Sequence, residues 1–401
     1  MLCSYKGNLS MKSFLVFFLI FSSNLFAAYY DVLPKGVRNL TYQYTVTGEI
    51  NGRYTSSGNL QGYNVTANIN ADTIKGINTA VDTYLGTLSA QDYAAFSFGT
   101  FQGSASSKVN VQGLGGGYGL TNKATVYGFI PFYSATVDMH IVRTEKGRNN
   151  VGGAITLENL PDVDTRLIQS LFVNYYQYQP LGKWKANDFG DAEMGVLYQL
   201  KKWRNAGALI NTGVVAPTGR KDNPDIIQDI AFGDGQWDAF FEFGVGYTFS
   251  GVFNDFSIDQ WNRFTYQFPF SDEIRLPDSA TFPVTSNKGV AKIKFGNKAQ
   301  TNLKLNYRIS DQWGAGLAYS LELKEKDDYQ STKPATDEIL EDATDRSSHT
   351  GKFSLAYSTL NLYQQKKFFM PLMISATVNT IFAGKNTPKY ERADLQLSLF
   401  F

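Results

Sequence analysis

The chain has 401 residues and a formal net charge of +1, because 37 Lys and Arg nearly balance 36 Asp and Glu. This balance argues against a nucleic-acid partner. Mean hydropathy is −0.25, yet Phe, Trp and Tyr make up 15% of the residues. A sequence that is polar on average and rich in aromatics is typical of a transmembrane β-barrel, in which only alternate residues meet lipid.

A secretion signal is the first element that the sequence predicts. An apolar run at Phe14–Phe21 follows a lysine and leads to small residues, with cleavage expected near Ala27 or Ala28. The remaining chain has no apolar run long enough for a transmembrane helix, which argues against an inner-membrane protein. Cys3 precedes the signal, so the mature chain is expected to lack cysteine. A disulfide framework, a thiol catalyst and a Cys-based zinc site are excluded, and no cofactor is expected.

Period-two alternation predicts about twelve strands after the signal. One of the clearest carries Phe241, Phe243 and Val245 on one face, alternating with Glu242 and Gly244 on the other. We therefore expect an all-β protein, a transmembrane antiparallel up-and-down barrel of about 12 strands with short helices in its external loops. Behind a signal at residues 1–28, residues 29–401 form one barrel domain. The predicted strands are 40–50, 106–119, 124–141, 192–200, 208–216, 237–249, 255–268, 290–309, 313–323, 353–357, 374–382 and 391–401.

The connections between these strands alternate in length. Short turns next to aromatic residues such as Trp203, Phe253 and Trp313 alternate with long loops. Short periplasmic turns and longer external loops are typical of bacterial outer-membrane barrels. The alternative, a secreted soluble β-protein, does not predict aromatics gathered beside the short turns. The long loops are residues 51–104, 142–189, 218–236, 269–289 and 325–349.

The last predicted strand ends on an aromatic carboxyl terminus, Phe401. A final amphipathic strand that closes on Phe is the signal by which the barrel-assembly machinery selects its clients. We therefore expect that machinery as a partner, together with outer-membrane lipid and lipopolysaccharide. Acidic residues crowd the loop at 325–349, where they either repel and hydrate or contact lipopolysaccharide through bridging cations. Their spacing matches no calcium loop.

Two long loops contain apolar residues at helical spacing. We expect each helix at the outer mouth of the barrel or folded into its lumen. Two interpretations remain open: a plug that packs its apolar face on the barrel rim, or an apolar access site for a hydrophobic solute. The residues of this predicted loop gate are Ile74, Ile77, Val81, Leu85 and Leu88 in the first loop, and Leu167, Ile168 and Leu171 in the second.

Three Gly-rich stretches resemble one known family. They are Gly117–Tyr133, Phe189–Leu200, and Val214–Gly219 with the following Gly233–Asp238. They look like the outer-membrane family named for the MetA pathway of phenol degradation, a transporter-like group near the FadL channels. The resemblance covers roughly residues 110–250. It implies an outer-membrane channel for small, often aromatic or hydrophobic, molecules.

One departure from the FadL relatives affects the expected mechanism. Their N-terminal plug domain has no counterpart here, because the first strand begins about ten residues after the predicted cleavage point. The loop helices would then have to do the gating.

Alternation also predicts which charged residues face the lumen, where they tune selectivity. A basic wall facing an acidic wall would set a transverse field across the pore. The alternative is a set of cross-lumen salt bridges that fill and rigidify a narrow barrel. The basic residues are Lys292, Lys294, Lys298, Lys304 and Arg308. The acidic residues are Asp191, Glu193, Asp238 and Glu242, with Asp138 and His140 from the third strand.

These patterns favour a channel for passive passage of a small solute, including hydrophobic or aromatic ones. A non-conducting structural or surface-interaction protein is the alternative, and an outer-membrane phospholipase-type enzyme is third. The only histidines, His140 and His349, lie in no His-x-Ser-Asn pattern. No catalytic residue is therefore predicted. Two histidines without cysteine also make a transition-metal site a poor expectation.

Overall fold

The computed structural model describes residues 28–76, 79–147, 164–280 and 283–401. The predicted secretion signal lies outside these ranges except for Ala28, and so does Ile77 of the predicted loop gate. No helix in the described ranges is both long and apolar enough to cross a membrane.

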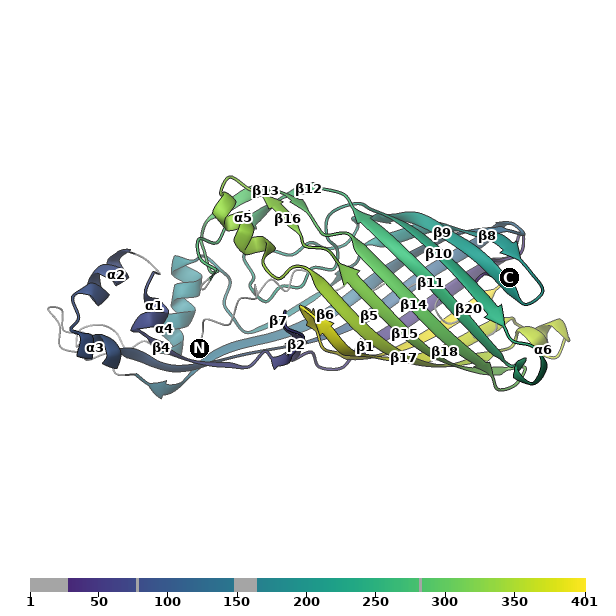
Figure 1. Cartoon of the computed structure of the whole chain (residues 1–401), viewed down its shortest axis with the longest axis horizontal. Helices are drawn as coiled ribbons and strands as arrows, with labels where there is room; N and C mark the ends of the chain where they lie inside the picture. The colour runs from purple at the N-terminus through teal and green to yellow at the C-terminus, as the bar shows by residue number, and fades with distance from the viewer. Residues whose placement is uncertain (1–27, 77–78, 148–163, 281–282) are drawn as a thin grey trace.

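Twelve antiparallel strands form a closed barrel (Figure 1). The ring runs β5-β1-β20-β18-β17-β15-β14-β11-β10-β9-β8-β6, and pairing between β5 and β6 closes it. The predicted fold class is therefore confirmed. The strands are β1 (Arg38–Thr47), β5 (Ser97–Thr121), β6 (Ala124–Lys146), β8 (Ala192–Lys202), β9 (Ala206–Ala216), β10 (Asp238–Thr248), β11 (Phe256–Gln267), β14 (Lys298–Arg308), β15 (Trp313–Lys324), β17 (Arg346–Ser358), β18 (Leu372–Lys385) and β20 (Glu391–Phe400).

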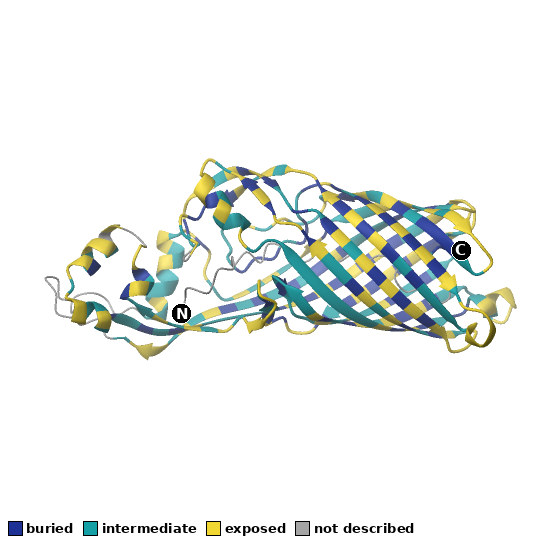
Figure 2. Cartoon of the chain, in the orientation of Figure 1, coloured by how far each residue is buried: buried dark blue, intermediate teal, exposed yellow. Residues whose placement is uncertain are grey.

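Exposed and buried residues alternate along most of the barrel wall (Figure 2). On β10, Phe241 is 50% exposed whereas Glu242 is fully buried, because one face of a strand meets lipid and the other meets the lumen. Trp203, Phe253 and Trp313 lie exposed beside the short turns, as an interfacial aromatic girdle requires. The described part of the chain thus has a lipid face and a lumen face.

The predicted strand at 290–309 is wrong as a single element. It is broken into β13 (Lys288–Lys294) and β14, with residues 295–297 between them. The cause is a close chain crossing: a Cβ added at Gly296 would lie 1.9 Å from the carbonyl oxygen of Glu325. The Gly296 amide also donates to Asp327 at 2.7 Å. Because Gly296 is held against Glu325 and Asp327, the strand is interrupted there and β13 lies outside the barrel.

β13 belongs to an extracellular cap above the outer mouth (Figure 1). This cap is a three-stranded sheet with one helix, and its own core contains Ile274, Ile293 and Tyr329. Its elements are β12 (Phe270–Arg275), β13, β16 (Asp328–Gln330) and α5 (Pro334–Glu341).

β5 and β6 continue past the ring as an outer extension, which carries most of the helices at its far end (Figure 1). The elements there are β4 (Val65–Asn70), α1 (Ala71–Ile74), α2 (Thr79–Gly86), α3 (Ala90–Ala95), α4 (Thr165–Ser170) and a π-helix at Leu171–Tyr175. β7 (Lys183–Phe189) pairs with β6 near the rim. Short elements elsewhere are β2 (Gly52–Tyr54), β3 (Leu60–Gly62), β19 (Thr387–Pro388), α6 (Leu360–Gln364) and a 3₁₀ turn at Gly251–Phe253.

The outer extension corrects the position expected for the first gate helix. Ile74 and Leu85 are buried with Phe96, and Val81 and Leu88 pack against them in a separate small core. The apolar face is therefore covered by neighbouring helices and by β5, away from the barrel mouth. In the second loop, Leu167 and Ile168 lie on α4 and Leu171 opens the π-helix. α4 contacts β6, and the Arg143 amide donates to Thr165 at 3.2 Å.

Candidate channel site in the barrel lumen

Glu242 on β10 is the most buried acid of the described lumen wall. The strand register places it directly opposite Arg263 on β11 and Asn211 on β9, with all three side chains directed inward. The Asn211 amide approaches Glu242 Oε1 at 3.5 Å, and the hydroxyl of Tyr29 donates to the same oxygen. Glu242 Oε2 has no hydrogen-bond partner among the described residues. A buried carboxylate with spare acceptor capacity is unusual in a folded protein.

Arg263 forms an ion pair with Glu193 of β8, with Nη2 2.7 Å from Oε2. Its guanidinium lies 3.7 Å from the ring centroid of Phe240, and the Tyr127 hydroxyl donates to Glu193 at 2.8 Å. Removing one partner of such a buried pair costs about 3–5 kcal/mol, because the other charge stays buried. The Tyr127 hydroxyl also lies 3.2 Å from Oδ1 of Asn211. Glu193 and Glu242 therefore belong to one network across β6, β8, β9, β10 and β11.

The segment at residues 28–37, the N-terminal strap, lies inside the barrel. Tyr29 stacks on Trp261 of β11 with ring centroids 4.8 Å apart and planes at 9°. Asp31 pairs with Lys202 at 2.6 Å, and the Leu33 amide donates to Thr125 at 2.8 Å. The ten described residues before β1 are too few for a plug domain, in line with the expectation, yet they reach the lumen.

Glycines on the inner wall make room for the strap. A Cβ added at Gly244 would lie 2.1 Å from Cε1 of Tyr29, and one at Gly207 would lie 2.3 Å from the ring of Tyr30. Gly246 also faces Tyr30, and Gly119 lies against the backbone of Pro34. A larger residue at any of these positions would have to displace the strap, since glycine alone allows so close an approach.

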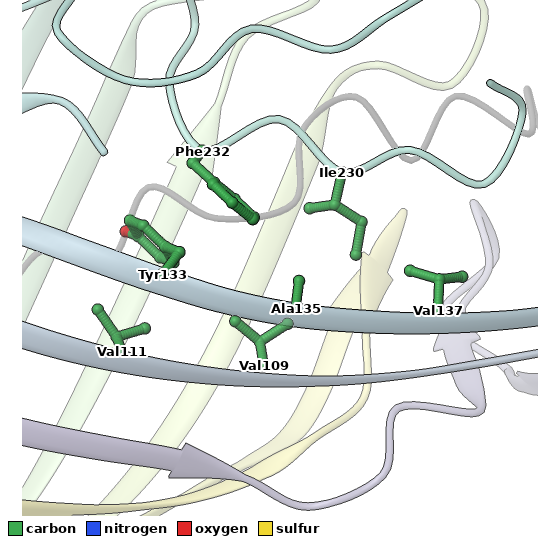
Figure 3. Packing of buried hydrophobic residues seen from close by; sticks show 7 residues of the cluster. All are labelled: Val109, Val111, Tyr133, Ala135, Val137, Ile230 and Phe232. Atoms are coloured by element: carbon green, nitrogen blue, oxygen red, sulfur yellow. The ribbon is translucent and has the colours of Figure 1, made fainter. Parts of the chain in front are cut away.

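Residues 217–237, the inner loop, fold back onto the inner face of β5 and β6 (Figure 3). Ile230 and Phe232 pack on Val109, Tyr133 and neighbouring residues, and the Phe232 and Tyr133 rings stack at 5.2 Å. A buried salt bridge within the loop joins Arg220 to Asp229 at 2.6 Å. The inner loop therefore fills part of the lumen near the outer mouth.

Alternation places Asp138 and His140 inward and the valines of β5 and β6 outward, and this packing reverses both faces. Val109 and Val137 are fully buried against the inner loop instead of facing lipid. Asp138 and His140 have the opposite parity and lie on the part of β6 beyond the ring, where their side chains are about half exposed and 2.5 Å apart. The prediction that they line the pore is wrong, because the inner face of this strand pair is apolar.

Asp191 and Asp238 anchor the two ends of the inner loop. Asp191 follows β7 and accepts from the amides of Gly219 at 2.8 Å and Asp234 at 3.0 Å. Asp238 opens β10 and accepts from Gln236 at 3.0 Å. Both carboxylates are therefore bonded to the inner loop, whereas alternation in the sequence predicts that they line the pore.

Of the five predicted pore-lining bases, two face the lumen. Lys298 and Lys304 on β14 are buried inside the barrel. Lys292 and Lys294 lie on β13 in the cap, so their predicted place in the wall is wrong. Arg308 lies at the turn end of β14 and pairs with Asp255 at 2.7 Å, with half of its side chain exposed.

The bases that face the acidic network come from other strands. β14 is only two strands from β10 in the ring, whereas β20 lies six strands from β10 and β17 lies six strands from β8. β20 contributes Arg392, which pairs with Asp394 at 3.0 Å. Lys352 of β17 is the register partner of Asn379, whose amide donates to Asp394 at 2.6 Å. Sequence reasoning did not single out Lys352, although its alternation with Phe353 already placed it inward.

Arg275 of the cap holds three extracellular loops together. Its guanidinium donates to the carbonyl oxygens of Tyr176 and Thr285 at 2.6 Å and to the carboxylate of Asp225 at 2.6 Å. It also lies 3.9 Å from the Tyr178 ring centroid. Asp225 further pairs with Lys288 at 2.6 Å. Burial alone would raise the pKa of Asp225, but the Lys288 and Arg275 ion pairs outweigh it and lower that pKa.

No protein-family model matches the sequence, and no curated protein matches it. Among solved structures, the chain is similar to the COG4313 outer membrane channel from Pseudomonas putida F1, with 12% identity and a TM-score of 0.52. That match covers 93% of this chain and 98% of the other. The P. putida toluene transporter TodX has 10% identity and a TM-score of 0.37, over 92% and 91% of the two chains.

A Pseudomonas aeruginosa FadL homologue has 8% identity and a TM-score of 0.33, over 92% of this chain and 90% of that one. At these identities the likeness concerns the fold alone. A closed twelve-stranded barrel and an outer-membrane channel as structural neighbour agree on one location. The chain is a β-barrel protein of the bacterial outer membrane.

Proposed function

We propose that the protein is a passive outer-membrane channel for small solutes, including hydrophobic and aromatic ones. The observation that carries the proposal is the distribution of charge inside the closed barrel. Glu193 and Glu242 outnumber Arg263 on one side, and Lys352 and Arg392 outnumber Asp394 on strands half-way round the ring. Opposed charges across a narrow lumen orient a passing solute and select among ions.

Aromatic side chains next to these charges support the hydrophobic part of the proposal. Tyr127, Phe240 and Trp261 are buried on the inner wall beside the acidic network. A wall that combines stacking surfaces with hydrogen-bonding groups accepts amphipathic rings as well as water. The Gly-rich stretches described above support a further part of this proposal, membership of the family named for the MetA pathway of phenol degradation.

Passage in this proposal requires movement of the lumen segments. The strap occupies the wall between β5 and β11, and the inner loop covers the inner face of β5 and β6. Neither segment supplies a strand to the ring, so a shift of either one would leave the barrel closed. The strap and the inner loop, and not the distant helices α1 to α3, are then the gating elements.

The presence of the strap and the inner loop in the lumen also favours a second candidate, a non-conducting structural or surface-interaction protein. In that case both segments block the lumen permanently, and the outer extension is the functional part. Measurements on the purified full chain in planar bilayers and in liposomes separate the two. The channel predicts discrete conductance steps and liposome swelling with small solutes. A chain that folds but neither conducts nor swells liposomes overturns the channel, and release of fatty acid from the same liposomes would instead indicate the phospholipase.

A further inference from the structure

The side chain of Tyr29 occupies a site that fits one aromatic ring. This site, the seat, is formed by Trp261, Gly244 and Glu242. The ring lies parallel to Trp261, and the floor beneath it is the backbone of Gly244, which is the register partner of Trp261. Any Cβ at position 244 would overlap the ring, at 2.1 Å from Cε1. Parallel, offset aromatic contacts of this kind add to the free energy of burial.

The hydroxyl end of the seat is the carboxylate of Glu242. Its hydrogen-bond donors in the described chain are the hydroxyl of Tyr29 and the Asn211 amide, the latter at a long 3.5 Å. Arg263, directly opposite, forms its ion pair with Glu193. Because Glu242 is fully buried and only the distant Asn211 amide otherwise approaches its Oε1, a group that fills the seat without a donor leaves that oxygen poorly satisfied, which costs free energy.

The strap can release Tyr29 without leaving the barrel. The anchors that hold the strap lie further along it: Asp31 on Lys202 at 2.6 Å, the Leu33 amide on Thr125 at 2.8 Å, and the Gly36 amide on the Gly119 carbonyl at 2.8 Å. The backbone of Tyr29 itself makes one longer contact, from its amide to Asp259 at 3.2 Å. The Tyr30 carbonyl also accepts from Gln199 at 2.8 Å, so the seat would open by rotation at Tyr29 itself while Tyr30 stays in place.

We infer that this seat is a binding site for a neutral aromatic solute with a ring hydroxyl, and that the Tyr29 side chain occupies the site when no solute is bound. The inference rests on the proposed function, because the lumen is the route by which a solute reaches Glu242. A hydrocarbon ring without a hydroxyl leaves the buried carboxylate without its donor, and a carboxylated ring brings a second negative charge beside it. A hydroxylated ring satisfies both the stacking surface and the acceptor.

Calorimetric titration of the detergent-purified full chain tests the inference. Tyr29→Ala should bind phenol, whereas toluene, cyclohexanol and benzoate should each bind about tenfold or more weakly, since a hydrogen bond to a charged group contributes on this scale. Adding Glu242→Leu to Tyr29→Ala should remove the preference for phenol over toluene. Equal binding of phenol and toluene to Tyr29→Ala overturns the site.

Tyr30→Ala is the matched control, because Tyr30 is a buried strap tyrosine that contacts Gly207 and Gly246 instead of Glu242. It should gain no hydroxyl-dependent binding, and a gain equal to that of Tyr29→Ala also overturns the site. If Tyr29→Ala does not fold, Tyr29→Leu keeps an apolar group against Trp261 and should show the same order of preference with weaker binding. Titration needs no passage, so a barrel that binds phenol but never conducts refutes the channel alone.

Discussion

Arg275 and Asp225 are joined by a 2.6 Å ion pair that links the cap to the inner loop. The two residues come from β12 and from the loop before β10, and the pair is sealed by the Arg275 contacts to the Tyr176 and Gln177 carbonyl oxygens. One guanidinium therefore joins three loops at the outer mouth. An arginine can do this because its planar fork presents five donors.

Replacing Arg275 by lysine should loosen the cap. Arg275→Lys keeps the charge but loses most of the carbonyl contacts, and we expect a loss of about 2 kcal/mol in cap stability. Limited proteolysis of the folded protein should then cut loops near 176 and 225 faster than in the wild type. Arg308→Lys is the control, since its pair with Asp255 is half exposed and contributes little. Equal cleavage of both variants would refute the prediction that Arg275 holds the cap and these loops together.

The stability of the cap should depend on pH through Asp225. Its folded pKa is lowered by its partners, against the effect of burial, so its stabilising contribution is present above the unfolded pKa of about 3.9 and disappears as pH falls through the folded pKa. Wild type should therefore exceed Asp225→Asn in thermal midpoint at pH 7, and the gap should close in acid. Asp311→Asn, in an exposed short turn, should show no such gap. A gap that persists unchanged at pH 2.5 contradicts the prediction.

Charge reversal should separate the bases inside the barrel from those outside it. Lys304→Glu with Lys352→Glu inverts charges on β14 and β17, so the reversal potential of the channel in a salt gradient should shift toward cation selectivity. The matched pair Lys292→Glu with Lys294→Glu changes the same net charge on β13, outside the ring, and should leave selectivity within error of the wild type. If both pairs act alike, selectivity does not reside in the lumen.

The inner loop should become mobile when its apolar anchor is removed. Phe232→Ala deletes a ring that is 2% exposed and stacked on Tyr133, which should cost about 3–5 kcal/mol. Single-channel records should then show larger and noisier conductance than the wild type. Val290→Ala in the cap removes an apolar side chain that is 64% exposed, and its records should not change. A quiet, unaltered conductance in Phe232→Ala would show that the inner loop does not limit passage.

Alternation in the sequence was sufficient to predict most of the barrel. On β10 every second residue meets lipid, so Phe241 and Glu242 were assigned to the correct faces from the pattern alone. It failed on β5 and β6, because Val109 and Val137 pack on an inner loop that alternation cannot detect. An apolar face indicates burial, and it does not say whether lipid or protein covers it.

The site was predictable only in part. Glu193, Glu242, Lys298 and Lys304 were placed inward from parity, but their partners depend on ring order and register. The break at Gly296 depends on a contact with Glu325 that no local pattern records. The sequence places the glycines of β10 inward, but it does not predict that the strap packs against them.

The apolar inner face of β5 and β6 constrains any attempt to widen this pore. With the inner loop shortened, the side chains of Val109, Val111 and Val137 would lose their apolar cover and face water. The exposed apolar surface on this part of the wall would favour local collapse or association with a second molecule over an open pore. A wider pore therefore requires replacing these valines by polar residues as well as shortening the inner loop.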